Sequence, residues 1–186
     1  MTAEFTITVA GTKFLLQLQG KTPPYRKDLC EVLILATEIE RKFLVDAKKV
    51  SALNFSAEEI IAQGYLSTEP TIRVRLKNNR GFLTIKSATV GIERSEFEYE
   101  IPIRDAEELL QLCGSRVLSK VRRKIFHGGH LWEVDFFGGK LDGLILAEVE
   151  LASPDEFVEV PDWVTREVSG DVRYFNSNLS LTSELP

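Results

Sequence analysis

The sequence predicts an α+β protein that is mainly β, in which one antiparallel sheet is covered by a few short helices. Segment after segment alternates charged and apolar residues with a period of two, as in residues 70–77 and 92–101. Turn signals such as Gly128-Gly129 separate neighbouring segments. A sheet built from such strands has one apolar face, and short helical segments such as residues 105–113 can cover it.

The composition is that of one globular domain. The 186 residues are 44% hydrophobic and 27% charged, and a formal net charge of -5 disfavours a protein dedicated to the nucleic-acid backbone. No apolar run approaches the ~20 residues of a membrane helix, and the N-terminus lacks the layout of a secretory signal. We therefore expect a cytoplasmic protein without membrane or nucleic-acid partners.

Cysteine and histidine do not predict a metal site. Cys30 and Cys113 stand apart, without the spacing of a zinc site, and are expected to be reduced thiols. His127 and His130 flank the Gly-Gly turn and have no third ligand nearby in the sequence. We expect both histidines to be turn residues.

Residues 1–35 are expected to form an N-terminal extension, followed by the main domain at residues 36–186. Two apolar stretches, residues 5–9 and 14–18, lie on either side of Gly11 and suggest a short hairpin. The extension carries no charged constellation, so we expect the functional site to lie outside it.

Short helices are predicted from capping residues. Residues 56–63 follow this pattern, because a serine stands at the N-cap and Glu59 at the capping-box position. Residues 105–113 begin with Asp105, which is expected to cap them, and residues 153–156 resemble a further helix start.

Acidic and basic side chains fall into separate rows along the predicted strands. In the first of them, Glu38, Glu40 and Lys42 share one face, and Arg41 points the other way, where we expect it to lie outside the functional site. The later rows are Arg73/Arg75/Lys77, Lys86, Glu96/Glu98/Glu100, Lys120/Arg122/Lys124, Glu133/Asp135 and Glu148/Glu150. A solvated sheet face usually mixes polar residues loosely, so this segregation suggests a ligand.

Two interpretations of the charged rows remain open from spacing alone. One is a salt-bridge lattice with no ligand. The other is a bound polyphosphate with divalent cations, in which Arg73 and Arg75 hold phosphoryl oxygens bidentately and carboxylates hold Mg2+ or Mn2+. Either arrangement supplies the partners without which buried charges are unfavourable.

The stretch Glu38-Ile39-Glu40-Arg41-Lys42 resembles the ExExK signature of the CYTH domains, the triphosphate tunnel metalloenzymes. The later motifs follow in the matching order over residues 36–180. These are Arg73-Val74-Arg75, Lys86, Glu98-Tyr99-Glu100, Lys120-Val121-Arg122, Asp135 and Glu148-Val149-Glu150. The resemblance implies an eight-stranded antiparallel β-barrel, the triphosphate tunnel, with short helices packed outside it.

The resemblance also implies residue roles. The implied phosphate-binding residues are Lys42, Arg73, Arg75, Lys86, Lys120 and Arg122. The implied ligands of Mg2+ or Mn2+ are Glu38, Glu40 and Glu150, with Asp135 and Glu148 completing the metal set. The implied catalytic residues are Lys42, paired with Tyr65, and Glu98 and Glu100, either of which could take the proton of the attacking water; a metal-bound hydroxide is the alternative.

The activity implied is metal-dependent hydrolysis of inorganic triphosphate to pyrophosphate and phosphate, because we can assign no side-chain cluster to an organic moiety. The alternatives are a nucleoside or thiamine triphosphatase, a class IV adenylyl cyclase, and a non-catalytic binder of polyphosphate or nucleotide. The expected partner is a small-molecule triphosphate, and the sequence leaves a homodimer open.

Overall fold

The computed structural model describes residues 3–9, 12–18, 36–87 and 93–186, with side chains described for residues 39–87 and 95–186. The chain forms two compact units, Met1–Ile34 and Leu35–Pro186. In the first unit, β1 (Ala3–Val9) pairs antiparallel with β2 (Thr12–Leu18), which is the hairpin expected there. Cys30 lies outside the described residues.

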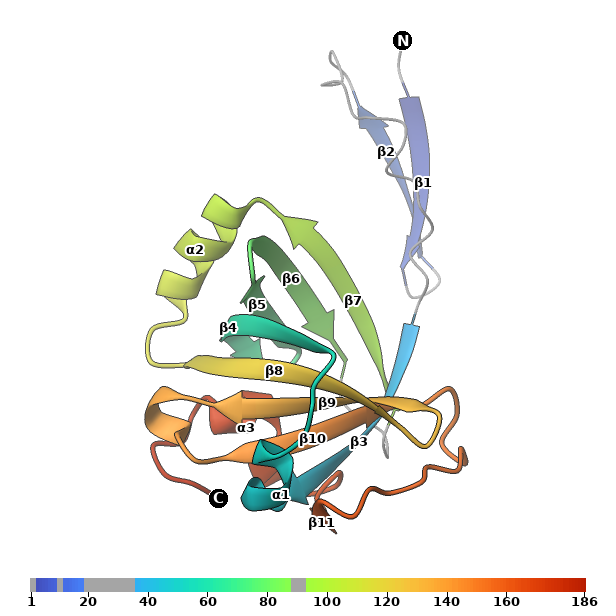
Figure 1. Ribbon diagram of the computed structural model, residues 1–186. Coiled ribbons are helices and arrows are strands. Elements are labelled where there is room, and N and C mark those ends of the chain that lie inside the picture. The colour runs from blue at the N-terminus through green and yellow to red at the C-terminus, as the bar shows by residue number, and fades with distance from the viewer. Residues whose placement is uncertain (1–2, 10–11, 19–35, 88–92) are drawn as a thin grey trace. The chain divides into compact units, whose positions relative to one another are not determined.

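The second unit is a closed barrel of eight antiparallel strands with a ninth strand at its edge (Figure 1). The strands are β3 (Ala36–Val45), β4 (Ala57–Thr68), β5 (Thr71–Lys77), β6 (Arg80–Lys86), β7 (Glu93–Ile101), β8 (Val117–His127), β9 (His130–Phe137), β10 (Ile145–Glu150) and β11 (Val164–Glu167). They follow the order β10-β9-β8-β4-β5-β6-β7-β3-β11, and β10 also pairs with β3. The predicted eight-stranded barrel is confirmed, and β11 is an addition that the sequence did not predict.

Strand β3 closes the barrel because its two halves pair with different neighbours. Near its start, Ile39 lies opposite Glu93 of β7. Further along, Glu40 lies opposite Glu150 at the end of β10, and that pairing continues to Leu44, opposite Leu146. Strand β11 then pairs with the last residues of β3. Such a stagger between strand ends is what closure of a sheet requires.

The helix predicted for residues 56–63 is wrong, because this segment is the first half of β4. Ile61 and Gln63 are buried, while Ile60, directly before Ile61, is 67% exposed, which is the alternation of a strand. Both edges of β4 are paired, with β5 and with β8. These backbone hydrogen bonds and the burial outweigh the local capping signal at Glu59.

The helices are α1 (Ala47–Ser51), α2 (Ile103–Leu112) and α3 (Asn176–Leu179), with 3-10 turns η2 (Gly139–Leu141) and η3 (Val172–Tyr174). Helix α2 is the one predicted at 105–113, but it begins after Pro102, so Asp105 lies in its first turn and is not the cap. Gly64 of β4 lies under α2, since an added Cβ would be 2.7 Å from the Sγ of Cys113. This glycine permits close packing and does not end a helix. Among the described residues, no helix is long and apolar enough to span a bilayer.

Residues 153–156 do not start a helix, so that prediction is also wrong. The Glu156 carboxylate instead accepts a hydrogen bond from the backbone N–H of Ala152 at 2.6 Å and turns the loop back on itself. Helix α1 was not predicted. It is capped by Asp46, whose side chain accepts from the backbone N–H groups of Lys48 and Lys49.

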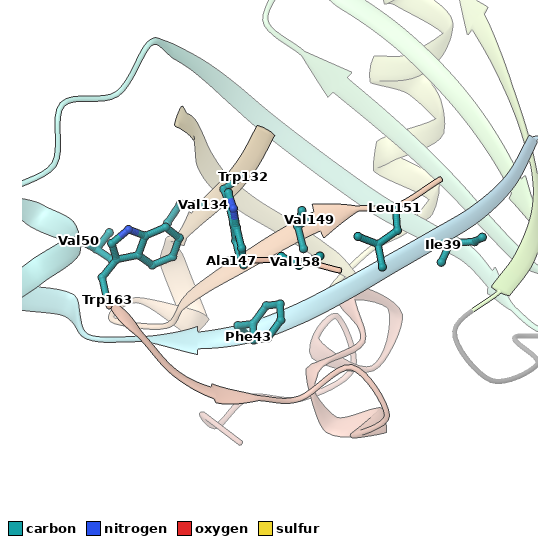
Figure 2. Close-up of a cluster of buried hydrophobic side chains, with 10 residues drawn as sticks. All are labelled: Ile39, Phe43, Val50, Trp132, Val134, Ala147, Val149, Leu151, Val158 and Trp163. Carbon is teal, nitrogen blue, oxygen red and sulfur yellow. The ribbon is translucent and has the colours of Figure 1, made fainter. Parts of the chain in front are cut away.

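The main hydrophobic cluster lies on the outer face of β3, β9 and β10 (Figure 2). Its centre is Trp132, whose ring centroid is 5.4 Å from those of both Phe43 and Trp163. The other buried members are Ile39, Val50, Val134, Ala147, Val149, Leu151 and Val158. Because side chains alternate between faces, this packing directs the charged rows of the same strands into the barrel.

A second cluster occupies one end of the barrel interior. Its strand residues lie two positions from the charged ones and so share their inward face. Leu44 follows Lys42, Leu118 precedes Lys120, Phe137 follows Asp135 and Leu146 precedes Glu148. The C-terminal segment adds Val168, Tyr174 and Leu179, the last from α3. The inward faces therefore change from apolar to charged along each of these strands.

Candidate active site

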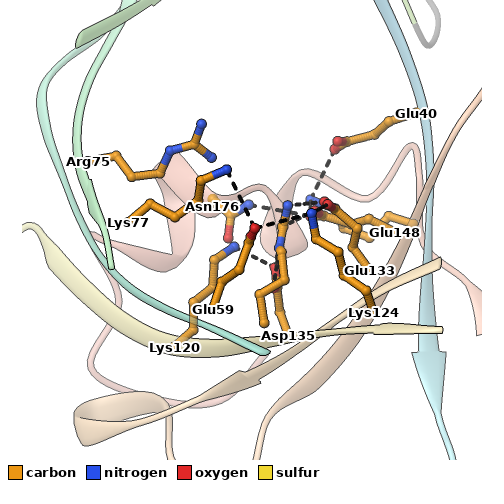
Figure 3. Close-up of polar contacts among 12 residues, drawn as sticks. Glu40, Glu59, Arg75, Lys77, Lys120, Lys124, Glu133, Asp135, Glu148 and Asn176 are labelled. Carbon is orange, nitrogen blue, oxygen red and sulfur yellow. Dashed lines mark hydrogen bonds and ion pairs between the residues drawn. The ribbon is translucent and has the colours of Figure 1, made fainter. Parts of the chain in front are cut away.

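Acids and bases alternate across the charged part of the interior (Figure 3). The Nζ of Lys42 lies 2.8 Å from Oε1 of Glu148 and 3.4 Å from Oε1 of Glu40. Lys42 and Glu148 are both buried, so this is an ion pair shielded from water. The next base along the row of contacts is Arg122, whose Nη2 lies 2.6 Å from the other oxygen of Glu148.

Arg122 is the centre of the acidic part of the site. Its Nε and Nη2 donate to the two oxygens of Asp135 at 2.6 and 2.7 Å, and it also pairs with Glu133. Asp135 is fully buried and also accepts a hydrogen bond from a second base, the ammonium of Lys120, at 2.5 Å. Three carboxylates thus surround one guanidinium.

A second group of bases projects from β5 and β6. Arg73 contacts Glu96, Glu98 and the hydroxyl of Thr84 at 3.1 to 3.3 Å. Arg75 donates to Glu98 at 2.7 Å, and Lys86 pairs with Glu96 at 2.9 Å. The Nε atoms of both arginines are buried, and no hydrogen-bond acceptor for them is found among the described residues. Buried donors of this kind fit an anionic ligand.

Electrostatics keep most of these groups charged. Burial alone would lower the pKa of Lys42, but the carboxylates of Glu148 and Glu40 outweigh it and raise that pKa above its usual value. Burial would likewise raise the pKa of Glu148, but Lys42 and Arg122 hold it well below its usual range. Burial lowers the pKa of Lys120 to about 8, in spite of the neighbouring Asp135. The Lys42 ammonium and the Glu148 carboxylate are therefore each stabilised in the charged form.

The structure brings most of the predicted site residues together in this lattice. They are Glu40, Lys42, Arg73, Arg75, Lys86, Glu98, Lys120, Arg122, Asp135 and Glu148. Glu100 lies nearer to solvent, with a 54% exposed side chain that pairs with Arg80 at 2.6 Å. Glu150 is exposed and lies opposite Glu40. The backbone of Glu38 lies in β3, but its side chain is outside the described ones.

Tyr65 is buried in β4, not placed after a helix as its sequence context suggested. Its hydroxyl accepts a hydrogen bond from Nε2 of Gln63 at 2.9 Å. The pairing of Tyr65 with Lys42 stays a prediction. Arg41 lies on the outer face, as expected, where it pairs with Glu167 of β11 at 2.6 Å.

Several residues of the lattice were not predicted. Glu59 was missed because its segment was interpreted as a helix; period-two alternation over residues 57–65 is the signal that could have found it. Thr84 donates to Glu98 at 2.8 Å from the inward face of β6. Asn176 reaches Glu148 at 3.5 Å from the C-terminal segment, and no sequence pattern relates these two residues.

The donor set fits a hard divalent cation. Among the described side chains, no three of His, Cys, Asp and Glu already converge on a common point, because bases lie between the carboxylates. Glu40 and Glu150 nevertheless lie directly opposite each other on β3 and β10. Like charges in that position destabilise a sheet unless something neutralises them, and carboxylate oxygens are what Mg2+ and Mn2+ prefer.

A closed antiparallel barrel with acids and bases opposed across its interior is the architecture that the ExExK resemblance implied. Residues 36–179 match the CYTH domain, and the chain belongs to this family.

Two relatives carry the name inorganic triphosphatase. The one from Acetivibrio thermocellus is 43% identical over 148 residues, which cover 78% of this chain and 94% of the relative. The one from Nitrosomonas europaea is 38% identical over 154 residues, covering 78% and 98%. A crystal structure of an inorganic triphosphatase aligns with a TM-score of 0.58 at 34% identity, over 79% of this chain and 96% of that one.

Proposed function

We propose that this protein hydrolyses inorganic triphosphate to pyrophosphate and phosphate in a reaction that depends on Mg2+ or Mn2+. The observation that carries the proposal is the gathering of six bases from four strands inside one closed barrel. These are Lys42, Arg73, Arg75, Lys86, Lys120 and Arg122. The two relatives named inorganic triphosphatase support it. A cytoplasmic location and the absence of nucleic-acid and membrane partners remain part of the proposal.

Substrate binding would exchange partners within the lattice. Every phosphoryl oxygen that enters can replace a carboxylate as the acceptor for a base, so the bases remain neutralised throughout. The buried Nε atoms of Arg73 and Arg75 would gain acceptors, which the described part of the chain does not offer them. Binding would therefore satisfy two buried donors for which the described side chains supply no acceptor.

The released carboxylates would then hold the cation. Glu40, Glu148, Glu150 and Asp135 lie on three adjacent strands and would take this role, and Glu38 continues the row on β3. When bound, a divalent ion would withdraw charge from the phosphates and lower the pKa of a coordinated water.

The bases would stabilise the leaving pyrophosphate. The raised pKa of Lys42 keeps its ammonium charged, which suits neutralisation of the negative charge that develops on the bridging oxygen. Burial opposes ionisation of Glu98, but Arg75 and Thr84 lower its pKa, and the bond from Arg80 lowers that of Glu100. Lowered pKa values make both weak proton acceptors, so they suit the orientation of the arginines and of the attacking water better than proton removal.

The test is phosphate release from inorganic triphosphate, ATP and thiamine triphosphate with Mg2+ or Mn2+, for the wild type, Lys42→Met and Arg41→Met. The two variants are a matched pair, because each removes one cation from β3. The two positions are adjacent in the sequence, but their side chains lie on opposite faces of the strand. We expect inorganic triphosphate to be preferred, Lys42→Met to lower kcat by about 100-fold or more, and Arg41→Met to stay near wild type. Negligible release from all three compounds, with triphosphate still bound, would contradict the proposal and leave a binding protein.

A further inference from the structure

Three residues outside the predicted site form a bridge within the barrel, visible in Figure 3. One oxygen of Glu59, Oε1, lies 3.2 Å from Nζ of Lys124 and 3.6 Å from Nζ of Lys77. The two lysines come from β8 and β5, the strands on either side of β4, which carries Glu59. Lys124 also pairs with Glu133 at 3.1 Å. A single carboxylate thus pairs with a lysine from each neighbouring strand.

This bridge lies nearer to solvent than the proposed phosphate site. The side chains of Lys77, Lys124 and Glu59 are 27%, 21% and 18% exposed, compared with 2% for Lys120 and 5% for Lys42. Lys77 and Lys124 are the next inward-facing positions after Arg75 and Arg122, about 7 Å further along their strands. The two lysines therefore continue the basic rows outward.

A linear polyphosphate longer than three groups would extend along these rows. Its additional phosphoryl group would meet Lys77 and Lys124, but the carboxylate of Glu59 already lies between them. Bringing an anion beside Glu59 is unfavourable, and the two lysines would first have to leave their partner.

On these contacts, and resting on the function proposed above, we infer that Glu59 is a specificity-determining residue that restricts the site to chains of three phosphoryl groups. Its carboxylate ends the basic rows at Arg75 and Arg122. Removing that charge releases Lys77 from Glu59 and leaves Lys124 with Glu133 as its carboxylate partner, so that both lysines can contact the end of a longer chain.

The experiment compares inorganic tripolyphosphate with tetrapolyphosphate in the wild type, Glu59→Gln and Glu58→Gln. Glu58 is the matched control, because it lies on the outer face of the same strand, where it pairs with Arg123 at 2.8 Å. Both substitutions change the net charge by the same amount. We expect the ratio of kcat/KM for tetrapolyphosphate over tripolyphosphate to rise about fivefold in Glu59→Gln and to stay at the wild-type value in Glu58→Gln.

A double variant tests the role of Lys77, one of the two lysines that pair with Glu59. In Glu59→Gln/Lys77→Met the gain should fall by at least half, because the lysine that Glu59→Gln releases from its carboxylate is gone. An unchanged ratio in a folded Glu59→Gln protein would overturn the inference, as would an equal rise in Glu58→Gln.

Calorimetric binding of the same two polyphosphates, with metal chelated, gives the selectivity ratio without turnover. This separates the two proposals. A wild type that binds but does not hydrolyse tripolyphosphate would refute the proposed function, while the binding ratio would still decide the role of Glu59.

Discussion

The ammonium of Lys120 lies 2.5 Å from the carboxylate of Asp135, and the two side chains are only 2% and 0% exposed. Asp135 also accepts two hydrogen bonds from Arg122, so one buried carboxylate holds both the buried Lys120 and the partly buried Arg122. Removal of one partner of a buried pair leaves charge without compensation, which destabilises far more than loss of a surface pair. The lattice therefore stabilises the fold as well as preparing the site for a ligand.

The first prediction concerns this carboxylate. Asp135→Asn keeps the shape but removes the charge beside Lys120 and Arg122, so we expect the free energy of unfolding to fall by about 3 kcal/mol. Urea unfolding followed by circular dichroism measures it. Glu58→Gln, which breaks an exposed pair with Arg123, should change the value by less than about 1 kcal/mol. Equal small changes in both variants would show that the buried pair does not stabilise the barrel.

A second prediction concerns pH and the loop after β10. His130 pairs with Glu156 at 2.9 Å, and this bond, together with the carbonyl of Gly128, raises the pKa of His130. A raised pKa in the folded state stabilises the fold below the unfolded pKa of about 6.5, and the contribution disappears as pH rises through the folded value. Glu156 stays ionised across this range because the His130 bond lowers its pKa.

The variant His130→Gln should therefore be less stable than the wild type at about pH 5.5, and the difference should shrink by about pH 8.5. Chemical unfolding at the two pH values measures it. A difference that grows with pH would contradict the assignment of a charged His130.

A third prediction concerns the contact between β4 and α2. Gly64→Ala places a methyl group 2.7 Å from the Sγ of Cys113, which we expect to lower the unfolding free energy by about 1 to 3 kcal/mol. Gly170→Ala is the control, because an added Cβ there meets nothing within 4 Å, and it should stay within about 0.5 kcal/mol of wild type. Thermal or urea unfolding of both proteins checks the prediction. Equal stability of the two variants would mean that α2 shifts freely away from β4.

A fourth prediction concerns the N-terminal unit. A chain that starts at Leu35 retains the compact unit Leu35–Pro186 and every proposed site residue from Glu38 onward. We expect its kcat and KM for inorganic triphosphate to match those of the full chain within about twofold. A folded truncation without activity would show that residues 1–34 take part in the site.

The sequence by itself determined most of the strands and which of their residues face inward. Period-two alternation places Lys42 beside Glu40 and opposite Arg41 on any extended backbone, so these directions follow from local geometry alone. The Gly128-Gly129 turn is similarly local, since both glycines adopt positive φ, which other residues rarely do. The ordered set of charged motifs also predicted a closed barrel, because it resembles the motifs of the CYTH family.

Only the tertiary structure decided which side chains meet. Residues 56–63 carry a helix cap signal, but β8 pairs with residues 57–64 and β5 pairs from residue 61 onward, and β4 forms instead. The contact between Asn176 and Glu148 joins positions that no local pattern relates. Glu59 forms ion pairs with Lys77 and Lys124 only because β4 lies between β5 and β8. Strand order is set by the packing of the whole barrel, and local periodicity carries no information about it.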